Sequence, residues 1–138
     1  MVVLKRLSDA QRDGDRIYAL LRGTAINHDG ASSGLTVPNG VAQEQVIRAA
    51  LADAGLSGPD IDFVECHGTG TRLNDTAEAK AIRALFAAPI PVISTKGFTG
   101  HTLGAAGALE FAFASCAIEE GWIPPSLGAD PIDPEIHL

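Results

Sequence analysis

The most informative stretch of the chain is STKGFTGHTLGAAGALEFAFASC, residues 94–116. It places a cation, Lys96, and an imidazole, His101, in a glycine-spaced turn that leads directly into a segment with almost no polar side chains. Burying such groups costs free energy unless they have partners. Residues 103–113 are apolar nearly all round, which is typical of a helix packed on several sides. The stretch therefore predicts a helix buried between layers, with polar chemistry at its head.

The same order of strand, glycine-rich turn with a histidine, and helix occurs twice in the chain. The predicted elements are the strands 61–66 and 90–95, the turns 67–74 and 96–102, and the helices 75–86 and 103–121. Asp75 followed by Glu78 matches a capping box, so both carboxylates are interpreted as helix caps rather than as an acid and a base. The repeat predicts that both turns lie at one edge of a sheet.

The first part of the chain predicts further elements. These are strands over 1–7 and 16–26, a polar turn over 9–15, a long turn over 27–40, and an amphipathic helix over 41–55 that stops at Gly55. Alternating strands and helices favour an α/β fold with a parallel or mixed sheet. The proline-rich end, 124–138, has the composition of a connection to a further segment.

Composition narrows the class of protein. The chain has 138 residues, about the length of one domain, and a net charge of -7, which argues against nucleic acid or an anionic membrane as partner. Two cysteines, Cys66 and Cys116, give no disulfide framework and favour a reduced cytoplasmic setting. The amino terminus lacks the pattern of a signal peptide, and Glu110 interrupts the longest apolar run. A soluble cytoplasmic protein is expected.

The candidate chemistry centres on His67 and His101. At one sheet edge, two neutral imidazoles can donate hydrogen bonds to an oxygen that gains negative charge, and Lys96 can add positive field or orient one ring. Thr69 and Thr71 offer two hydroxyls to a ligand. The structural alternatives are that each histidine satisfies a local carbonyl, that the lysine is solvated, and that the threonines bond turn amides.

Several other classes of site are disfavoured. Neither glycine-rich turn completes a dinucleotide or phosphate-loop motif. Cys66 and His67 are neighbours whose side chains diverge on a strand, which makes a shared zinc site unfavourable. GASSG, residues 30–34, matches a nucleophile elbow around Ser32, but the next residues do not begin a helix, so a hydrolase is disfavoured.

ECHGTGTRLND and STKGFTGHTLGAAGALE resemble the two signature segments in the carboxyl-terminal half of beta-ketoacyl-acyl-carrier-protein synthases, the condensing enzymes of fatty-acid and polyketide assembly. The resemblance covers essentially all of residues 1–138 as a partial carboxyl-terminal domain, with 1–7 similar to the last strand of the family's first half. It implies a thiolase-like α/β fold in which a helix is buried between sheets. Residues 27–40 lean toward modular polyketide synthases, whereas 72–82 and 100–110 lean toward the fatty-acid type.

The resemblance also implies a decarboxylative Claisen condensation. His67 and His101 would stabilise the enolate oxygen, and Lys96 would hold the hydrogen-bond network of the site. The supporting residues implied are Thr69 and Thr71, which would contact phosphopantetheine, and Glu78, which would lie near Lys96. No cofactor is expected on the chain itself, because its substrates would travel on the phosphopantetheine of an acyl carrier protein.

Some family features are missing from the sequence. The nucleophilic cysteine belongs to the family's first half, and the phenylalanine loop near the carboxyl terminus has no counterpart, so the chain alone is expected to be inactive. Gly97 stands where the family more often has serine. The expected partners are acyl carrier protein, the missing half and a second copy of the complete enzyme. A non-catalytic partner resembling a chain-length factor is the alternative function, and a thiolase acting on coenzyme A esters is a weaker one.

Overall fold

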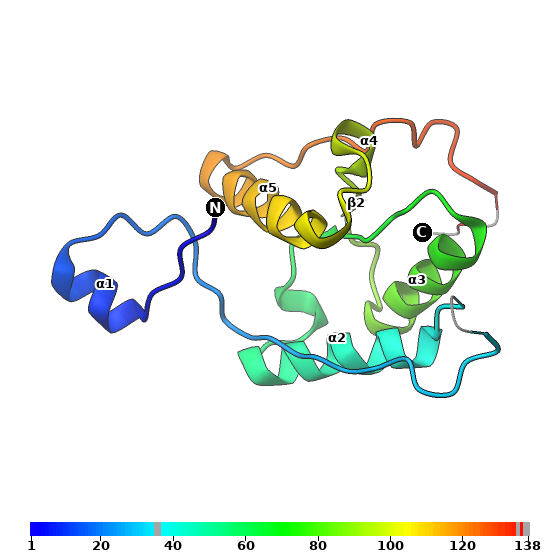
Figure 1. Ribbon diagram of the computed structural model, residues 1–138, viewed down its shortest axis with the longest axis horizontal. Coiled ribbons are helices and arrows are strands. Elements are labelled where there is room, and N and C mark those ends of the chain that lie inside the picture. The colour runs from blue at the N-terminus through cyan, green and yellow to red at the C-terminus, as the bar shows by residue number, and fades with distance from the viewer. Residues whose placement is uncertain (35–36, 135, 137–138) are drawn as a thin grey trace.

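The computed structural model describes residues 1–34, 37–134 and 136. Within them the helices are α1 (Leu7–Asp13), α2 (Gly40–Ala54), α3 (Arg72–Leu85), α4 (Lys96–Thr99) and α5 (Ala106–Glu120), with 3-10 turns η1 (Gly58–Asp60) and η2 (Leu103–Ala105). The strands are β1 (Val64–Glu65) and β2 (Val92–Ile93). In Figure 1, α5 lies across the molecule from α2, and α1 stands apart from the other helices.

The two strands form a parallel sheet, with Val64 opposite Val92 and Glu65 opposite Ile93. The main-chain N–H of Cys66 extends the ladder by donating to the carbonyl of Ile93 at 2.8 Å. Helix α3 makes the crossover between the strands, as in a βαβ unit. The predicted alternation and the parallel pairing are therefore confirmed, although both strands are shorter than the predicted ranges 61–66 and 90–95.

Helix α2 ends where its sequence predicts. At its start the side chain of Asn39 accepts hydrogen bonds from the main-chain N–H groups of Val41 and Ala42, and Gly55 ends the helix with φ 64°. Helix α2 packs against α3. The small core beside these helices is built from short or branched side chains, namely Ala42, Ala79, Ala81 and Ile82.

The predicted strands over 1–7 and 16–26 are wrong. Residues 7–13 form α1 in place of the expected polar turn, and the later segment runs without ladder pairing alongside α2 (Figure 1). Two of its hydrogen bonds go to that helix: the main-chain N–H of Thr24 donates to the carboxylate of Asp53 at 2.9 Å, and the guanidinium of Arg22 donates to the carbonyl of Ala54. At its start, Arg16 pairs instead with Glu119 of α5. A strand requires a neighbouring strand, and no described residue offers one there.

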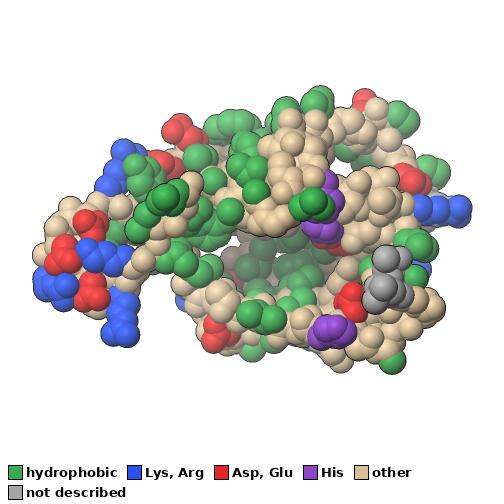
Figure 2. All heavy atoms as spheres, viewed as in Figure 1, with side chains coloured by type: hydrophobic (Ala, Val, Ile, Leu, Met, Phe, Trp, Pro, Cys, Tyr) green, Lys and Arg blue, Asp and Glu red, His purple; other side chains and the backbone are tan. Residues whose placement is uncertain are grey.

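Helix α5 differs from the expected buried helix. Within the described residues only Ala106 and Ala117 of α5 are buried, whereas Leu109 and Ile118 are exposed. Figure 2 shows hydrophobic side chains on the surface over this helix. The apolar pattern indicated helix correctly, but the layers that would cover it are not part of the described chain. None of the described helices combines the length and apolar character needed to cross a membrane.

Candidate active site

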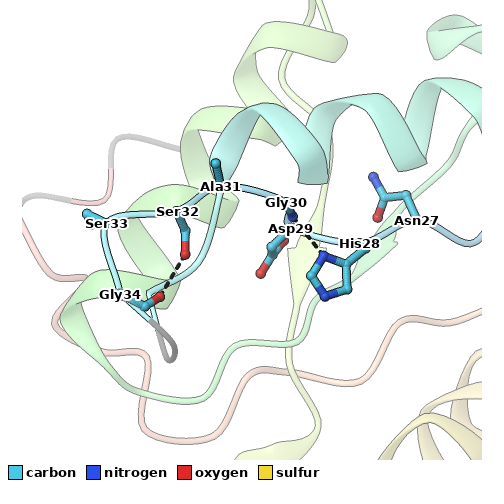
Figure 3. Close-up of a pocket in the computed structure, with 8 residues that line it drawn as sticks. All are labelled: Asn27, His28, Asp29, Gly30, Ala31, Ser32, Ser33 and Gly34. Carbon is cyan, nitrogen blue, oxygen red and sulfur yellow. Dashed lines mark hydrogen bonds between the residues drawn. The ribbon is translucent and has the colours of Figure 1, made fainter.

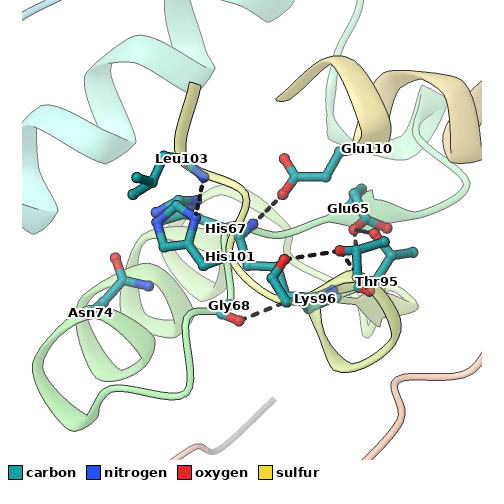
Figure 4. Close-up of polar contacts among 12 residues, drawn as sticks. Glu65, His67, Gly68, Asn74, Thr95, Lys96, His101, Leu103 and Glu110 are labelled. Carbon is teal, nitrogen blue, oxygen red and sulfur yellow. Dashed lines mark hydrogen bonds and ion pairs between the residues drawn. The ribbon is translucent and has the colours of Figure 1, made fainter. Parts of the chain in front are cut away.

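The carboxyl ends of the two strands bring His67 and His101 together. Their ring centroids lie 5.0 Å apart and the rings meet edge to face at 86°. Figure 4 shows both rings beside the turn that carries Lys96. Both histidines are exposed, so a ligand has access to them. The structure thus places the two imidazoles at one edge of the sheet, where their positions in the repeat predicted them.

The hydrogen bond at His101 defines which ring nitrogen is available. Its Nδ1 accepts from the main-chain N–H of Leu103 at 3.3 Å, a contact visible in Figure 4. A neutral imidazole with Nδ1 as acceptor carries its proton on Nε2. The backbone of Leu103 is left-handed, with φ 53°, an uncommon conformation for a leucine. This turn therefore orients His101 with an N–H group free to donate.

The turn that carries His67 is held by Glu78 of α3. One carboxylate oxygen of Glu78 accepts from the main-chain N–H of His67 at 2.6 Å, and the other accepts from the N–H of Gly68 at 2.9 Å. Asn74 adds a longer bond to the second oxygen at 3.4 Å. The helix therefore reaches back to its own preceding turn and fixes the main chain at His67.

The predicted capping box of Asp75 and Glu78 is wrong. Helix α3 begins at Arg72 with Thr71 as its N-cap, three residues before the predicted start, and the N–H of Asp75 is already bonded to the carbonyl of Thr71. The run of alternating glycines in HGTGT hid this earlier start. Glu78 consequently lies in the second turn of the helix, where its carboxylate is free to bind the histidine turn.

Lys96 is nearly buried, with 9% of its surface exposed, which contradicts the alternative of a solvated lysine. Its ammonium pairs with the carboxylate of Glu110 on α5, and the two side chains are 7% and 19% exposed. Glu110 is a residue that sequence reasoning missed, having been noted only as an interruption of an apolar run. A lone carboxylate inside an apolar helix, near a turn with an expected buried cation, was the available signal.

Thr69 and Thr71 lie on the same turn as His67. Their hydroxyl oxygens are 2.8 Å apart, so one hydroxyl donates to the other. Thr69 is half-buried and Thr71 is exposed. The pair is therefore placed beside the histidines with hydroxyl lone pairs remaining for a further partner.

The two cysteines occupy different environments. Cys66 is buried directly before His67, and burial, followed by the nearby charge of Glu78, raises the pKa of its thiol. A raised pKa disfavours the thiolate, which is the nucleophilic form. Cys116 is exposed on α5. Cys66 is therefore a poor candidate for the nucleophile of an acyl-transfer reaction.

The segment that follows α5 returns to the Lys96 turn. The hydroxyl of Ser126 accepts from the main-chain N–H of Ser94 at 2.9 Å. A Cβ atom on Gly97 would lie 2.3 Å from the carbonyl oxygen of Leu127, which is closer than a Cβ atom can approach an oxygen without a shift of the backbone. Glycine at position 97 therefore matches the close approach of this segment to α4.

Two open hollows are lined by residues other than His67 and His101. One, of about 660 Å³, is lined by residues 27–34 (Figure 3), and a second, of about 800 Å³, lies between this loop and helices α2 and α3. In the loop the hydroxyl of Ser32 donates to the carbonyl of Gly34 at 2.7 Å, and α2 begins only at Gly40. Among the residues that the structure describes, Ser32 has neither the direct turn into a helix nor the base that a nucleophile elbow requires.

Comparison with known proteins identifies the family. Residues 18–130 match the family model described as beta-ketoacyl synthase, C-terminal domain. The chain belongs to the beta-ketoacyl synthase family. It is 49% identical over 142 aligned positions to polyketide synthase GfsE of Streptomyces halstedii, covering 99% of this chain and 4% of that protein. It is 48% identical to the phenolphthiocerol synthesis polyketide synthase Pks15/1 of Mycobacterium marinum, covering 94% and 6%.

Solved structures agree with this assignment of the ketosynthase segment. The oxazolomycin ketosynthase domain OzmH KS7 of Streptomyces albus JA3453 superposes with a TM-score of 0.91 at 39% identity, covering 97% of this chain and 24% of that chain. The ishigamide ketosynthase/chain length factor gives a TM-score of 0.84 at 36% identity, covering 94% and 32%. The α/β, thiolase-like fold class of a partial carboxyl-terminal domain is thereby confirmed. The segment spans a small part of the length of its relatives.

Proposed function

We propose that this chain forms the carboxyl-terminal part of a ketosynthase that catalyses decarboxylative condensation of a malonyl thioester with an acyl thioester. The observation that carries the proposal is the juxtaposition of His67 and His101, 5.0 Å apart at the ends of adjacent strands. The Nε2–H of His101 is available to an oxygen between them, because its Nδ1 already accepts from Leu103. Preorganised donors of this kind stabilise an oxygen that gains negative charge.

The proposed chemistry divides between this chain and a nucleophile that lies outside it. The bond between the malonyl carboxylate and its methylene carbon breaks, carbon dioxide leaves, and the electron pair forms an enolate whose oxygen accepts hydrogen bonds from His67 and His101. The enolate carbon then attacks the acyl group held as a thioester on a cysteine, and that cysteine leaves as thiolate. Lys96, paired with Glu110, holds the position of the His101 turn.

The remaining roles concern the substrate arm and the partners. The hydroxyls of Thr69 and Thr71 lie on the His67 turn, where they would contact the phosphopantetheine of an acyl carrier protein. The nucleophile would come from a ketosynthase amino-terminal half, and the complete enzyme would work as a homodimer in the cytoplasm. Since the relatives named above are polyketide synthases, we assign the segment to polyketide rather than fatty-acid assembly.

The test separates the two chemical steps in a complete ketosynthase that contains this chain. His67→Ala and His101→Ala should each lower the rate of carbon dioxide release from malonyl carrier protein by at least about a hundredfold. Transfer of the acyl group to the nucleophilic cysteine, followed by mass spectrometry, should survive in both variants. Ser32→Ala, in the loop of residues 27–34, serves as the control and should change neither step. Unchanged decarboxylation in both histidine variants would refute the assigned roles.

A non-catalytic role resembling a chain-length factor remains the second candidate, since one similar structure is titled a ketosynthase/chain length factor. The same variants discriminate between the two functions. In a non-catalytic partner, replacing His67 and His101 together would leave condensation by the assembled complex unchanged. The nearly buried pair of Lys96 and Glu110 beside the histidines favours the catalytic role. Burial of two charges costs desolvation free energy, and an apolar pair would serve a purely structural role as well.

A further inference from the structure

The two histidine turns are joined by a link that the proposed chemistry does not use. One carboxylate oxygen of Glu65 accepts two hydrogen bonds from Thr95, one from its main-chain N–H and one from its hydroxyl, both at 2.8 Å. Glu65 ends β1, two residues before His67, and Thr95 immediately precedes Lys96. Figure 4 shows the two side chains meeting beside Lys96. The link therefore runs between the strand end that carries one histidine and the turn that carries the other.

Thr95 is the N-cap residue of α4, at the start of the turn that leads to His101. It is 1% exposed, and its carbonyl accepts from the N–H groups of Phe98 at 2.9 Å and Thr99 at 3.2 Å, which closes the single turn of α4. Lys96 begins that helix. Any movement of Thr95 therefore moves the main chain of Lys96 and the turn that leads to His101.

The other oxygen of Glu65 shows that this link is not optimised for stability. It is buried and has no hydrogen-bond partner within the described part of the chain. A buried polar atom without a partner destabilises a fold, which offsets part of the stabilisation that the two bonds to Thr95 provide. The bonds to Thr95 nevertheless require an acceptor at this position. Glu65 is therefore better explained by the geometry it imposes than by the stability it contributes.

A second contact brings the same two turns close together. The hydroxyl of Ser94 donates to the carbonyl of Gly68 at 3.2 Å. A Cβ atom on Gly68 would lie 2.6 Å from the Cβ of Ser94, so the main chains approach as closely as a glycine permits. The contact stops the turns from moving together further, while the carboxylate of Glu65 stops Thr95 from moving away. The separation of the two imidazoles is thus bounded in both directions.

We propose that Glu65 is a positioning residue for decarboxylation, which sets the distance between the His67 and His101 turns by binding the main chain and hydroxyl of Thr95. The inference rests on the proposed function of the two histidines. Glu65 does not touch substrate; it acts through Thr95 on the geometry of the donors. Since enolate stabilisation depends on that geometry, its loss lowers the rate of the chemical step and leaves carrier binding intact.

The experiment uses a complete ketosynthase that contains this chain, with malonyl carrier protein as the probe. Glu65→Ala and Thr95→Val should each lower kcat for carbon dioxide release by about tenfold or more, with KM and acyl transfer to the cysteine unchanged. Glu65→Gln and Thr95→Ser should keep most of kcat, because both retain the hydrogen bonds to the shared oxygen. Thr24→Val, at an exposed threonine, is the matched control and should have no effect.

A double variant tests whether the two residues act as one link. Glu65→Ala combined with Thr95→Val should be no worse than Glu65→Ala alone, because Glu65→Ala already removes the hydroxyl bond that Thr95→Val breaks. Additive losses would overturn the proposal. If Glu65→Ala does not fold, Thr95→Val decides alone, since it conserves the volume of the side chain and removes one bond.

The result also separates this inference from the proposed function. If His67→Ala abolishes decarboxylation while folded Glu65→Ala and Thr95→Val keep wild-type kcat, the positioning role is refuted and the histidine roles stand. Equal losses in decarboxylation and acyl transfer would likewise refute positioning, since they indicate general disruption. If His67→Ala and His101→Ala both retain decarboxylation, the proposed function fails whatever the behaviour of Glu65.

Discussion

The two units of strand, turn and helix have the same order of elements, but different contacts hold their turns in place. In the first, Glu78 of α3 reaches back and accepts two main-chain N–H groups of the turn that carries His67. In the second, Glu110 of α5 reaches back and binds the side-chain ammonium of Lys96. The first link satisfies neutral donors, whereas the second neutralises a nearly buried charge. Loss of the carboxylate is therefore expected to lower the free energy of unfolding more in the second unit than in the first. The reason is that an unpaired buried charge costs more free energy than an unpaired amide.

The helices of the two units also differ in what covers them. Helix α3 buries Ala79, Ala81 and Ile82 next to α2. Helix α5 is more apolar in sequence, yet it buries only two alanines within the described residues. The first unit is therefore closed by this chain itself, while the second presents an apolar helix that the thiolase-like fold would cover with further layers.

The largest effect is expected at the ion pair of the second unit. In a complete ketosynthase, Glu110→Gln should lower the free energy of unfolding by about 3 kcal/mol, because it leaves the Lys96 ammonium unpaired and nearly buried. Adding Lys96→Met should recover most of the loss, since no charge then remains. Urea unfolding followed by tryptophan fluorescence measures both changes.

The matched control for this prediction lies on the same helix. Glu119 pairs with Arg16, whose side chain is 68% exposed. Glu119→Gln should therefore change the free energy of unfolding by no more than about 1 kcal/mol. Equal losses for Glu110→Gln and Glu119→Gln would mean that burial does not distinguish the two pairs.

An intermediate effect is expected at Glu78. Glu78→Ala should lower the free energy of unfolding by about 2 kcal/mol, because the N–H groups of His67 and Gly68 lose their acceptor. Asp75→Asn should change it by less than about 0.5 kcal/mol, since Asp75 takes no part in a capping box. Thermal unfolding of the two variants gives the comparison. A loss at Asp75 as large as that at Glu78 would restore the capping box.

The smallest effect concerns the two cysteines, one in each unit. With iodoacetamide, the isolated chain should be labelled at exposed Cys116, whereas buried Cys66 should remain unreacted between pH 7 and 9. Burial raises the pKa of Cys66, so its thiol stays protonated and unreactive across this range. Peptide mass spectrometry locates the label. Labelling of both cysteines at the same rate would contradict the burial of Cys66.

The complete ketosynthase sharpens the same experiment. If further layers cover α5, labelling of Cys116 should slow by at least about tenfold relative to the isolated chain, in line with the dependence of thiol reactivity on exposure. An unchanged rate would show that this face of α5 stays open in the complete enzyme.

Local sequence signals predicted the elements whose stabilisation is local. Helix α2 ends at Gly55 because a left-handed residue is needed there, and glycine adopts that conformation readily. The repeat of strand, turn and helix also predicted that His67 and His101 would meet at one sheet edge. The strands over 1–7 and 16–26 failed, because β pairing depends on a neighbour that no local pattern reveals.

Sequence patterns indicated candidate residues for the site, but not the hydrogen bonds and ion pairs among them. Lys96 was predicted as a site residue with Glu78 in its surroundings, but its ion-pair partner was not predicted, and the structure pairs it with Glu110. Fourteen residues separate the two partners, and η2 and part of α5 intervene, so no helical or strand spacing joins them. The link between Glu65 and Thr95 spans thirty positions and is invisible in either motif alone.

The sequence by itself determined the order of the two strand, turn and helix units, the carboxyl end of helix α2, and the residue types in the two turns, because these depend on periodicity and on the conformational limits of glycine. Only the tertiary structure decided which carboxylate holds which turn. Glu65, Glu78 and Glu110 are chemically alike. Their different partners follow from where the parallel pairing of β1 and β2 and the direction of each following helix place them.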